Sequence, residues 1–251
     1  MNKFSKAFWI ANSVELLERL AYYAVFIVLT IYLSNIWGFS DAEAAIISGL
    51  FSGLLYLLPT FAGGYADKIG FRSSIILAFT LLTIGYAGLG VLPTLLESAG
   101  LVKYGAGEGE GIFSGYFNDI VTFGTNTEFN VLDKSYLRWT IAPVLLLIVV
   151  GGSFIKSVIS GTVARETNES NRAKGYALFY MMVNIGAFTG KTVVDPLRRS
   201  LCDQGLVYLN YFAATRTLLA LIAVFFFYKS TQTEGKGKSF SDIWQALLKV
   251  C

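Results

Sequence analysis

The stretch from residue 73 to residue 96 reads SSIILAFTLLTIGYAGLGVLPTLL and contains no charged side chain. A helix needs roughly 20 apolar residues to cross the hydrocarbon core of a bilayer, so this stretch is long enough to span a membrane. Further apolar runs of similar length lie on both sides of it. Together the expected spans are 7–36, 44–66, 73–96, 139–164, 175–194 and 206–228. We therefore predict an all-α, polytopic membrane protein, built as a bundle of six transmembrane helices.

The composition supports a membrane protein and excludes several other classes. Of the 251 residues, 54% are hydrophobic and 15% are charged, and the mean hydropathy is +0.56. Soluble domains have roughly a quarter of their residues charged. The chain has no histidine, which excludes Ser-His-Asp catalysis and histidine-ligated zinc. Its two cysteines form no metal cluster, and its net charge of +3 is spread along the chain. We expect no metal, no cofactor, no nucleic-acid partner and no enzymatic activity.

The predicted domain organisation is a six-helix transmembrane bundle over residues 1–230, followed by an inner linker over 231–251. Within the bundle, residues 97–138 form a long outer loop that is rich in glycine and acidic residues. We interpret this loop as a flexible or weakly folded cap, with a functional loop as the alternative. In the linker, apolar residues recur at helical spacing between 240 and 250, which indicates a short amphipathic helix on the inner membrane surface.

Lysine and arginine are distributed unequally between the expected loops. If the N-terminus is cytoplasmic, the inner segments hold about twice as many basic residues as the outer ones. Basic residues favour the cytoplasmic side of a membrane. We therefore predict a multi-pass protein of the cell membrane with both termini cytoplasmic, and we expect no cleavable signal peptide.

The first span carries charged residues in the middle of an apolar run. Glu15, Glu18, Arg19, Tyr22 and Tyr23 follow one another at offsets 0, 3, 4, 7 and 8, which places them along one face of a helix. Charges at this depth must line the bundle interior or a water-filled cavity. One interpretation is a static ion-pair cluster that locks helices together. The other is proton coupling, because two acids against one base leave one carboxylate poorly compensated and so favour its protonation.

The segment between the second and third spans reads GGYADKIGFR, from 63 to 72. Its Gly63, Asp67, Gly70 and Arg72 resemble the loop signature of the major facilitator superfamily. Glycines let two helices approach closely, and Asp67 can pair with a basic group or cap a neighbouring helix. The alternative is an ordinary basic loop on the cytoplasmic side.

The first span also resembles a narrower family. Residues 15–23, ELLERLAYY, are similar to the E-x-x-E-R signature with paired tyrosines of the proton-dependent oligopeptide transporter family. Tyr56, Lys156 and the run FYMMVNIGA at 179–187 lie where further signature positions of that family are found. This resemblance implies that the proton-coupling residues are Glu15, Glu18, Arg19 and Lys156, with the lysine paired to the glutamates. It implies a substrate site that includes Tyr22, Tyr23, Tyr56 and Asn184.

One position departs from the family pattern. The family commonly has an arginine seven residues after the arginine of E-x-x-E-R, where it is associated with binding the peptide carboxylate. This chain has Phe26 at that position. Arg216, inside the sixth span, is a candidate replacement cation; its alternatives are a helix-packing pair or a position nearer the outer surface.

The resemblance implies proton-coupled symport of di- or tripeptides or similar zwitterions. The family fold has two six-helix bundles with the substrate between them, so we interpret this chain as the N-terminal half. We expect it to be a truncated piece whose C-terminal bundle is missing, with a natural half-size carrier as the alternative. Its expected partners are a short-peptide or small-molecule substrate, protons, the lipid bilayer and that second bundle. The alternative functions are major facilitator transport of a non-peptide solute and a non-transporting receptor or scaffold.

Overall fold

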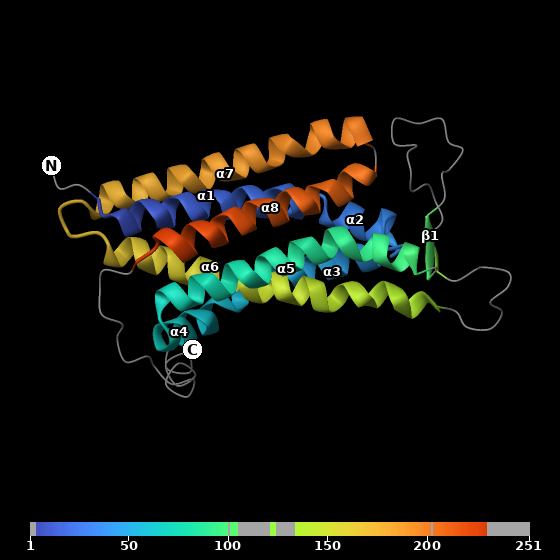
Figure 1. Cartoon of the computed structure of the whole chain (residues 1–251), viewed down its shortest axis with the longest axis horizontal. Helices are drawn as coiled ribbons and strands as arrows, with labels where there is room; N and C mark the ends of the chain where they lie inside the picture. The colour runs from blue at the N-terminus through green and yellow to red at the C-terminus, as the bar shows by residue number, and fades with distance from the viewer. Residues whose placement is uncertain (1–3, 100, 105–120, 124–133, 202, 230–251) are drawn as a thin grey trace.

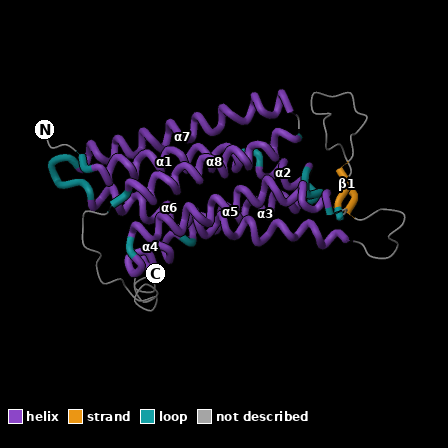
Figure 2. The backbone as a smooth tube through the Cα atoms, in the orientation of Figure 1, coloured by secondary structure: helices purple, strands orange, loops and turns teal. Residues whose placement is uncertain are grey.

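The computed structural model describes residues 4–99, 101–104, 121–123, 134–201 and 203–229. Long helices run side by side along the long axis of the molecule, and a small sheet lies at one end (Figures 1 and 2). The helices are α1 (Lys6–Phe26), α2 (Leu29–Asn35), α3 (Asp41–Leu57), α4 (Pro59–Ile69), α5 (Phe71–Ser98), η1 (Lys134–Thr140), α6 (Ile141–Arg165), α7 (Arg172–Leu201) and α8 (Gln204–Phe227). The strands are β1 (Val102–Tyr104) and β2 (Val121–Phe123), which pair antiparallel.

The helices account for up to six membrane spans by length and composition. Four of these spans are single helical stretches: α5, Tyr136–Arg165 (the end of η1 together with α6), α7 and α8. Two bent pairs pass the same test together, α1 with α2 at 44° and α3 with α4 at 46°. The predicted all-α, multi-pass membrane fold is confirmed, and the β1–β2 hairpin is a short addition between α5 and η1.

The bend between α3 and α4 has a local cause. Pro59 is the first residue of α4, directly after Leu58. Proline has no backbone N–H, and its ring crowds the preceding turn, so a helix kinks where proline interrupts it. The expected second span, 44–66, is therefore two helical segments with a kink at Leu58.

Both ends of the bundle are fixed by helix caps that also bond to other elements. At the N-terminus of α1, the Ser5 hydroxyl accepts from the Phe8 N–H and donates to Glu166, directly after α6. At the N-terminus of α3, Ser40 and Glu43 form a capping box. Glu43 also forms an ion pair with Arg138 of η1, at 3.2 Å. Each cap thus satisfies free N–H groups and joins segments far apart in sequence.

Glycines set the close approach of α7 to α1. A methyl group on Gly186 would lie 2.7 Å from the carbonyl oxygen of Leu16, and one on Gly190 would lie 2.5 Å from that of Leu20. Small residues four apart let two membrane helices pack backbone to backbone. Figure 1 shows the result, with α7 lying along α1 for most of its length. The expected inner linker, 231–251, and most of the expected outer loop lie outside the described residues.

Candidate functional site

The centre of the site is a group of three charged side chains on α1, which we call the α1 charged cluster: Glu15, Glu18 and Arg19. They are 4%, 2% and 7% exposed, respectively. The Arg19 Nε lies 3.1 Å from Glu15 Oε1 and 2.5 Å from Glu18 Oε2. Two buried carboxylates therefore share one guanidinium. Glu15 Oε2 and Arg19 Nη2 have no hydrogen-bond partner among the described residues, so the cluster retains capacity for a further proton or donor.

Lys156 of α6 lies beside this cluster without an ion pair to it. Both cations lie near the Tyr22 ring, with Arg19 Cζ 5.4 Å and Lys156 Nζ 5.8 Å from its centroid. The ammonium lies 4.0 Å from the Tyr56 ring centroid and donates to the carbonyl oxygen of Leu55, at 3.2 Å. Within the described part of the chain, no carboxylate oxygen lies within 4 Å of it. The expected direct pair between Lys156 and the first-span glutamates is thus not formed in this conformation.

The predicted tyrosines differ in their surroundings. Tyr22 is buried, Tyr23 is half-buried, and Tyr56 is 74% exposed on α3. Lys191 of α7 places its ammonium 5.1 Å from the Tyr23 ring centroid. Sequence reasoning did not select Lys191, because a lysine near the end of an apolar span is also the ordinary pattern of a lysine that extends to the interface.

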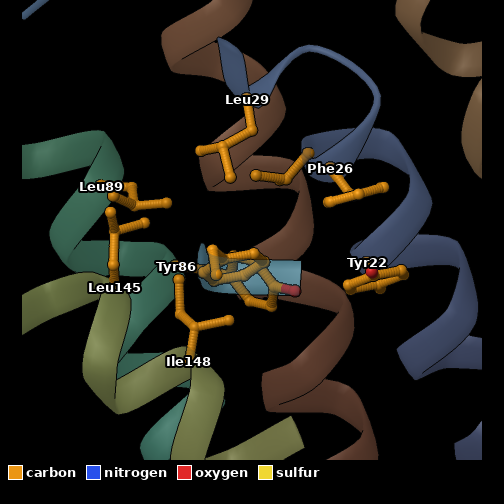
Figure 3. Close-up of a pocket in the computed structure, with 9 residues that line it drawn as sticks. Tyr22, Phe26, Leu29, Tyr86, Leu89, Leu145 and Ile148 are labelled. Atoms are coloured by element: carbon orange, nitrogen blue, oxygen red, sulfur yellow. The ribbon is translucent and has the colours of Figure 1, made fainter. Parts of the chain in front are cut away.

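An apolar recess opens beside the cluster, between α1, α2, α3, α5 and α6 (Figure 3). It has about 200 Å³ of empty space, including the open space at its mouth. The hydroxyl end of Tyr86 points toward Tyr22 across it. Its lining residues are Tyr22, Val25, Phe26, Leu29, Phe51, Tyr86, Leu89, Leu145 and Ile148. Most of this space is too narrow to admit even a water molecule, so the recess does not hold a peptide in this conformation.

Tyr86 is the main site residue that sequence reasoning missed. It is 2% exposed, and its hydroxyl end points toward Tyr22, the neighbour of the α1 charged cluster, across the recess. It lies in the uncharged third span, among many other apolar and aromatic residues. Nothing in its sequence context distinguishes it from a packing residue.

Asn184 and Arg216 lie apart from the α1 charged cluster in the contacts of the described residues. The Asn184 side chain is exposed on α7 and donates to the carbonyl oxygen of Tyr180, at 2.8 Å in its own helix. The Arg216 guanidinium lies 4.7 Å from the ring centroid of Phe212, also in its own helix. The structure therefore gives Arg216 a local aromatic partner and does not bring it to Phe26.

The loop signature residues connect the termini of different helices, at the end of the bundle opposite the sheet. Asp67 forms an ion pair with Arg165 of α6, at 3.1 Å. Arg72 donates to the carbonyl oxygen of Phe225, at 2.9 Å, near the end of α8. Gly70 has φ 90° between α4 and α5, which other residues adopt only with strain. Gly63 also leaves room for α6, since a methyl group there would lie 3.3 Å from Ser157 Cβ.

Comparisons with known proteins find dipeptide and tripeptide permeases and a solved transporter structure. Dipeptide and tripeptide permease A of Salmonella typhi is 35% identical over 191 residues, which are 74% of this chain and 29% of the permease. The permease A of Erwinia pyrifoliae is 24% identical over 251 residues, 99% of this chain and 42% of that protein. A solved structure described under "Structural insights into substrate recognition in proton dependent oligopeptide transporters" matches 97% of this chain and 46% of its own, with a TM-score of 0.65 and 19% identity. No family model matches the chain.

The chain is similar in sequence to these dipeptide and tripeptide permeases, and its fold is that of the solved proton-dependent oligopeptide transporter. It spans between 17 and 42% of the length of the curated relatives compared with it. These relatives are named as permeases and not as enzymes. The E-x-x-E-R segment forms the α1 charged cluster, and residues 179–187 contribute Gly186 to the contact between α1 and α7.

Proposed function

We propose that this chain forms one bundle of a proton-coupled symporter for di- and tripeptides or similar small zwitterions. The observation that carries the proposal is the buried α1 charged cluster, in which two carboxylates share the guanidinium of Arg19. A second cation, Lys156, lies near the same Tyr22 ring as Arg19 but donates to the Leu55 carbonyl. Protonation of one carboxylate removes a negative charge from such a cluster, and this changes the electrostatic attraction on the neighbouring cation. The names of the matched permeases support a peptide substrate.

The substrate site, as we propose it, includes Tyr22, Tyr23, Tyr56 and Asn184, with Arg216 as the candidate for a carboxylate. Hydroxyl and amide groups bond to peptide amides, which all peptides share, so such a site tolerates varied side chains. Tyr56 and Asn184 are exposed in the isolated chain. We infer that a second six-helix bundle covers these residues, which is consistent with the greater length of the relatives.

We also propose that the bundle comprises residues 1–230, with 231–251 as an inner linker and both chain ends cytoplasmic. The excess of basic residues in the inner segments supports this orientation. The pairing of Asp67 with Arg165 then lies at the cytoplasmic end.

Phe26 favours a second candidate function, transport of a solute without a free carboxylate. Its ring stacks on Tyr22, with centroids 5.1 Å apart and planes at 9°. An apolar ring at this position offers no charge to an acidic group. A major facilitator transporter of a non-peptide solute is therefore the alternative that the structure supports best.

The test is uptake by proteoliposomes that contain the chain, alone and fused to a second six-helix bundle of the family. We expect the fusion to take up a radiolabelled dipeptide when an inward proton gradient is applied, and the chain alone to take up none. Uptake by the chain alone would contradict the need for a second bundle. Uptake by the fusion that does not depend on the gradient would contradict proton coupling.

A further inference from the structure

The kink between α3 and α4 leaves one backbone carbonyl without its helical donor. In an α-helix, the carbonyl of residue 55 accepts from the N–H of residue 59. Residue 59 is proline, which has no N–H. Helical bonding is present directly beside this position, since the Leu58 N–H donates to Leu54 at 2.9 Å. The Leu55 carbonyl is therefore free for a side chain from another helix.

Two side chains of α6 bond to the backbone on either side of this gap. The Lys156 ammonium donates to the Leu55 carbonyl, at 3.2 Å, and the Ser157 hydroxyl donates to the Pro59 carbonyl, at 2.5 Å. Gly152 allows this approach, because a methyl group there would lie 2.8 Å from Leu55 Cδ2. A buried carbonyl without a donor is costly, so the ammonium satisfies a need that proline creates.

The same arrangement occurs a second time in the chain. Pro93 interrupts α5, and the carbonyl that it leaves free belongs to Leu89. The Tyr32 hydroxyl donates to that carbonyl, at 2.5 Å. Two helical prolines thus each leave a carbonyl that a polar side chain from another helix occupies. At Pro93 the donor is neutral, whereas at Pro59 the donor is a cation beside two carboxylates.

We propose that Pro59 is a positioning residue for Lys156. The Leu55 carbonyl is one docking point for the ammonium, and the carboxylates of the α1 charged cluster are the other. Glu15 Oε2, which has no hydrogen-bond partner among the described residues, is the acceptor that remains open for it. The inference rests on the proposed function, in which Lys156 takes part in proton coupling. It explains why the lysine can lie beside two buried carboxylates without pairing to either.

The Leu55 carbonyl can be observed directly by NMR of the chain in detergent micelles. Leu55–Tyr56 is the only Leu-Tyr step in the sequence, so ¹³C-carbonyl leucine combined with ¹⁵N-tyrosine isolates one correlation. We expect Lys156→Met to shift the Leu55 carbonyl resonance. In the Pro59→Ala background, the restored N–H occupies the carbonyl, and the same lysine substitution should then leave that resonance unmoved. Pro93→Ala is the matched control, and it should preserve the full Lys156→Met effect.

Two results would overturn the proposal. One is a Leu55 resonance that Lys156→Met does not move, which needs no proline variant and so stands even if Pro59→Ala fails to fold. The other is an equal Lys156→Met effect with proline and with alanine at position 59. Neither result depends on uptake, so a failure of this inference is distinguishable from a failure of the proposed transport function.

Discussion

Gly190 of α7 lies directly against the carbonyl of Leu20 of α1, with no space for a side chain between them. A methyl group at residue 190 would lie 2.5 Å from that carbonyl oxygen. We predict that Gly190→Ala lowers the free energy of unfolding by about 1–3 kcal/mol, because the helices must move apart. The measurement is thermal unfolding of the purified chain in detergent.

The matched control for Gly190→Ala is Gly53→Ala, in the middle of α3. A methyl group at residue 53 meets nothing within 4 Å. Alanine is the better helix former by about 0.5–1 kcal/mol, so this variant should be neutral or slightly more stable. An equal loss of stability in both variants would contradict the close contact between α1 and α7.

The second prediction concerns the pH dependence of stability and rests on Asp203, which lies between α7 and α8. Burial raises the pKa of this carboxyl above its ordinary value, although the hydrogen bond from Asn35 at 3.1 Å and the charge of Arg198 lower it. A raised pKa means that the folded state binds the proton more tightly than the unfolded state. Stability should therefore fall as pH rises from the ordinary aspartate pKa, about 3.9, through the raised value.

Asp203→Asn removes the charge and keeps an oxygen for Asn35. We expect this variant to be more stable than the wild type at neutral pH, and the difference to vanish below about pH 3.9, where both forms are uncharged. Thermal unfolding at several pH values measures this. A variant that is less stable than the wild type at neutral pH would show that the ionised carboxylate contributes stability.

The helices could be predicted from the sequence because apolar length alone separates membrane spans from loops. The bend at Leu58 was not predicted, although Pro59 signals it, since a kinked span and a straight one have the same hydropathy. The fifth span is longer than expected: α7 extends to Leu201, past Lys191 and Asp195, because a bundle tolerates charges near the ends of a helix.

The site was predicted only in part, because the sequence shows the spacing along one helix but not the contacts between helices. Helical spacing on α1 is local information, so Glu15, Glu18 and Arg19 could be placed on one face from the sequence. The position of Lys156 depends on the backbone of another helix, and its bond to Leu55 follows from the kink at Pro59. Side-chain spacing along one helix contains no information on such a contact.

The third prediction concerns orientation in the membrane. With both ends cytoplasmic, Cys202 should react with a membrane-impermeant thiol reagent added outside sealed cells, and Cys251 should not. Two single-cysteine variants, Cys251→Ser and Cys202→Ser, separate the signals. We expect labelling of the first variant only, because basic residues hold the inner segments in the cytoplasm. Labelling of the second variant alone would reverse the orientation.

The fourth prediction concerns coupling, in the fusion with a second bundle. Glu18→Gln removes one of the two carboxylates that share Arg19. Lys156→Ala removes the neighbouring cation. Removing one partner of a buried ion pair costs roughly 3–5 kcal/mol, because the other charge stays buried without compensation. We expect each variant to abolish uptake driven by a proton gradient and to retain counterflow exchange.

The control for the coupling variants is Lys174→Ala, an exposed lysine near the start of α7. It should support gradient-driven uptake at the wild-type rate. Gradient-driven uptake at that rate in both Glu18→Gln and Lys156→Ala would reject their assignment to proton coupling.

The last prediction concerns Phe26 and the substrate carboxylate. Its ring stacks on Tyr22 and lies 6.4 Å from that of Phe51, at the edge of the apolar recess. An arginine at this position can stack on Tyr22 through its planar guanidinium and present a positive charge to the recess. Hydrogen bonds to charged groups contribute about 1.5–3 kcal/mol. We therefore expect Phe26→Arg in the fusion to lower the KM for a free dipeptide, and the gain to be lost when the C-terminus of the dipeptide is amidated.

Phe26→Met, which is uncharged, is the control and should give no such gain. If the wild type already takes up dipeptides avidly, and neither amidation nor Arg216→Ala reduces that uptake, then Phe26 does not limit carboxylate recognition, and the group that binds the carboxylate belongs to the second bundle.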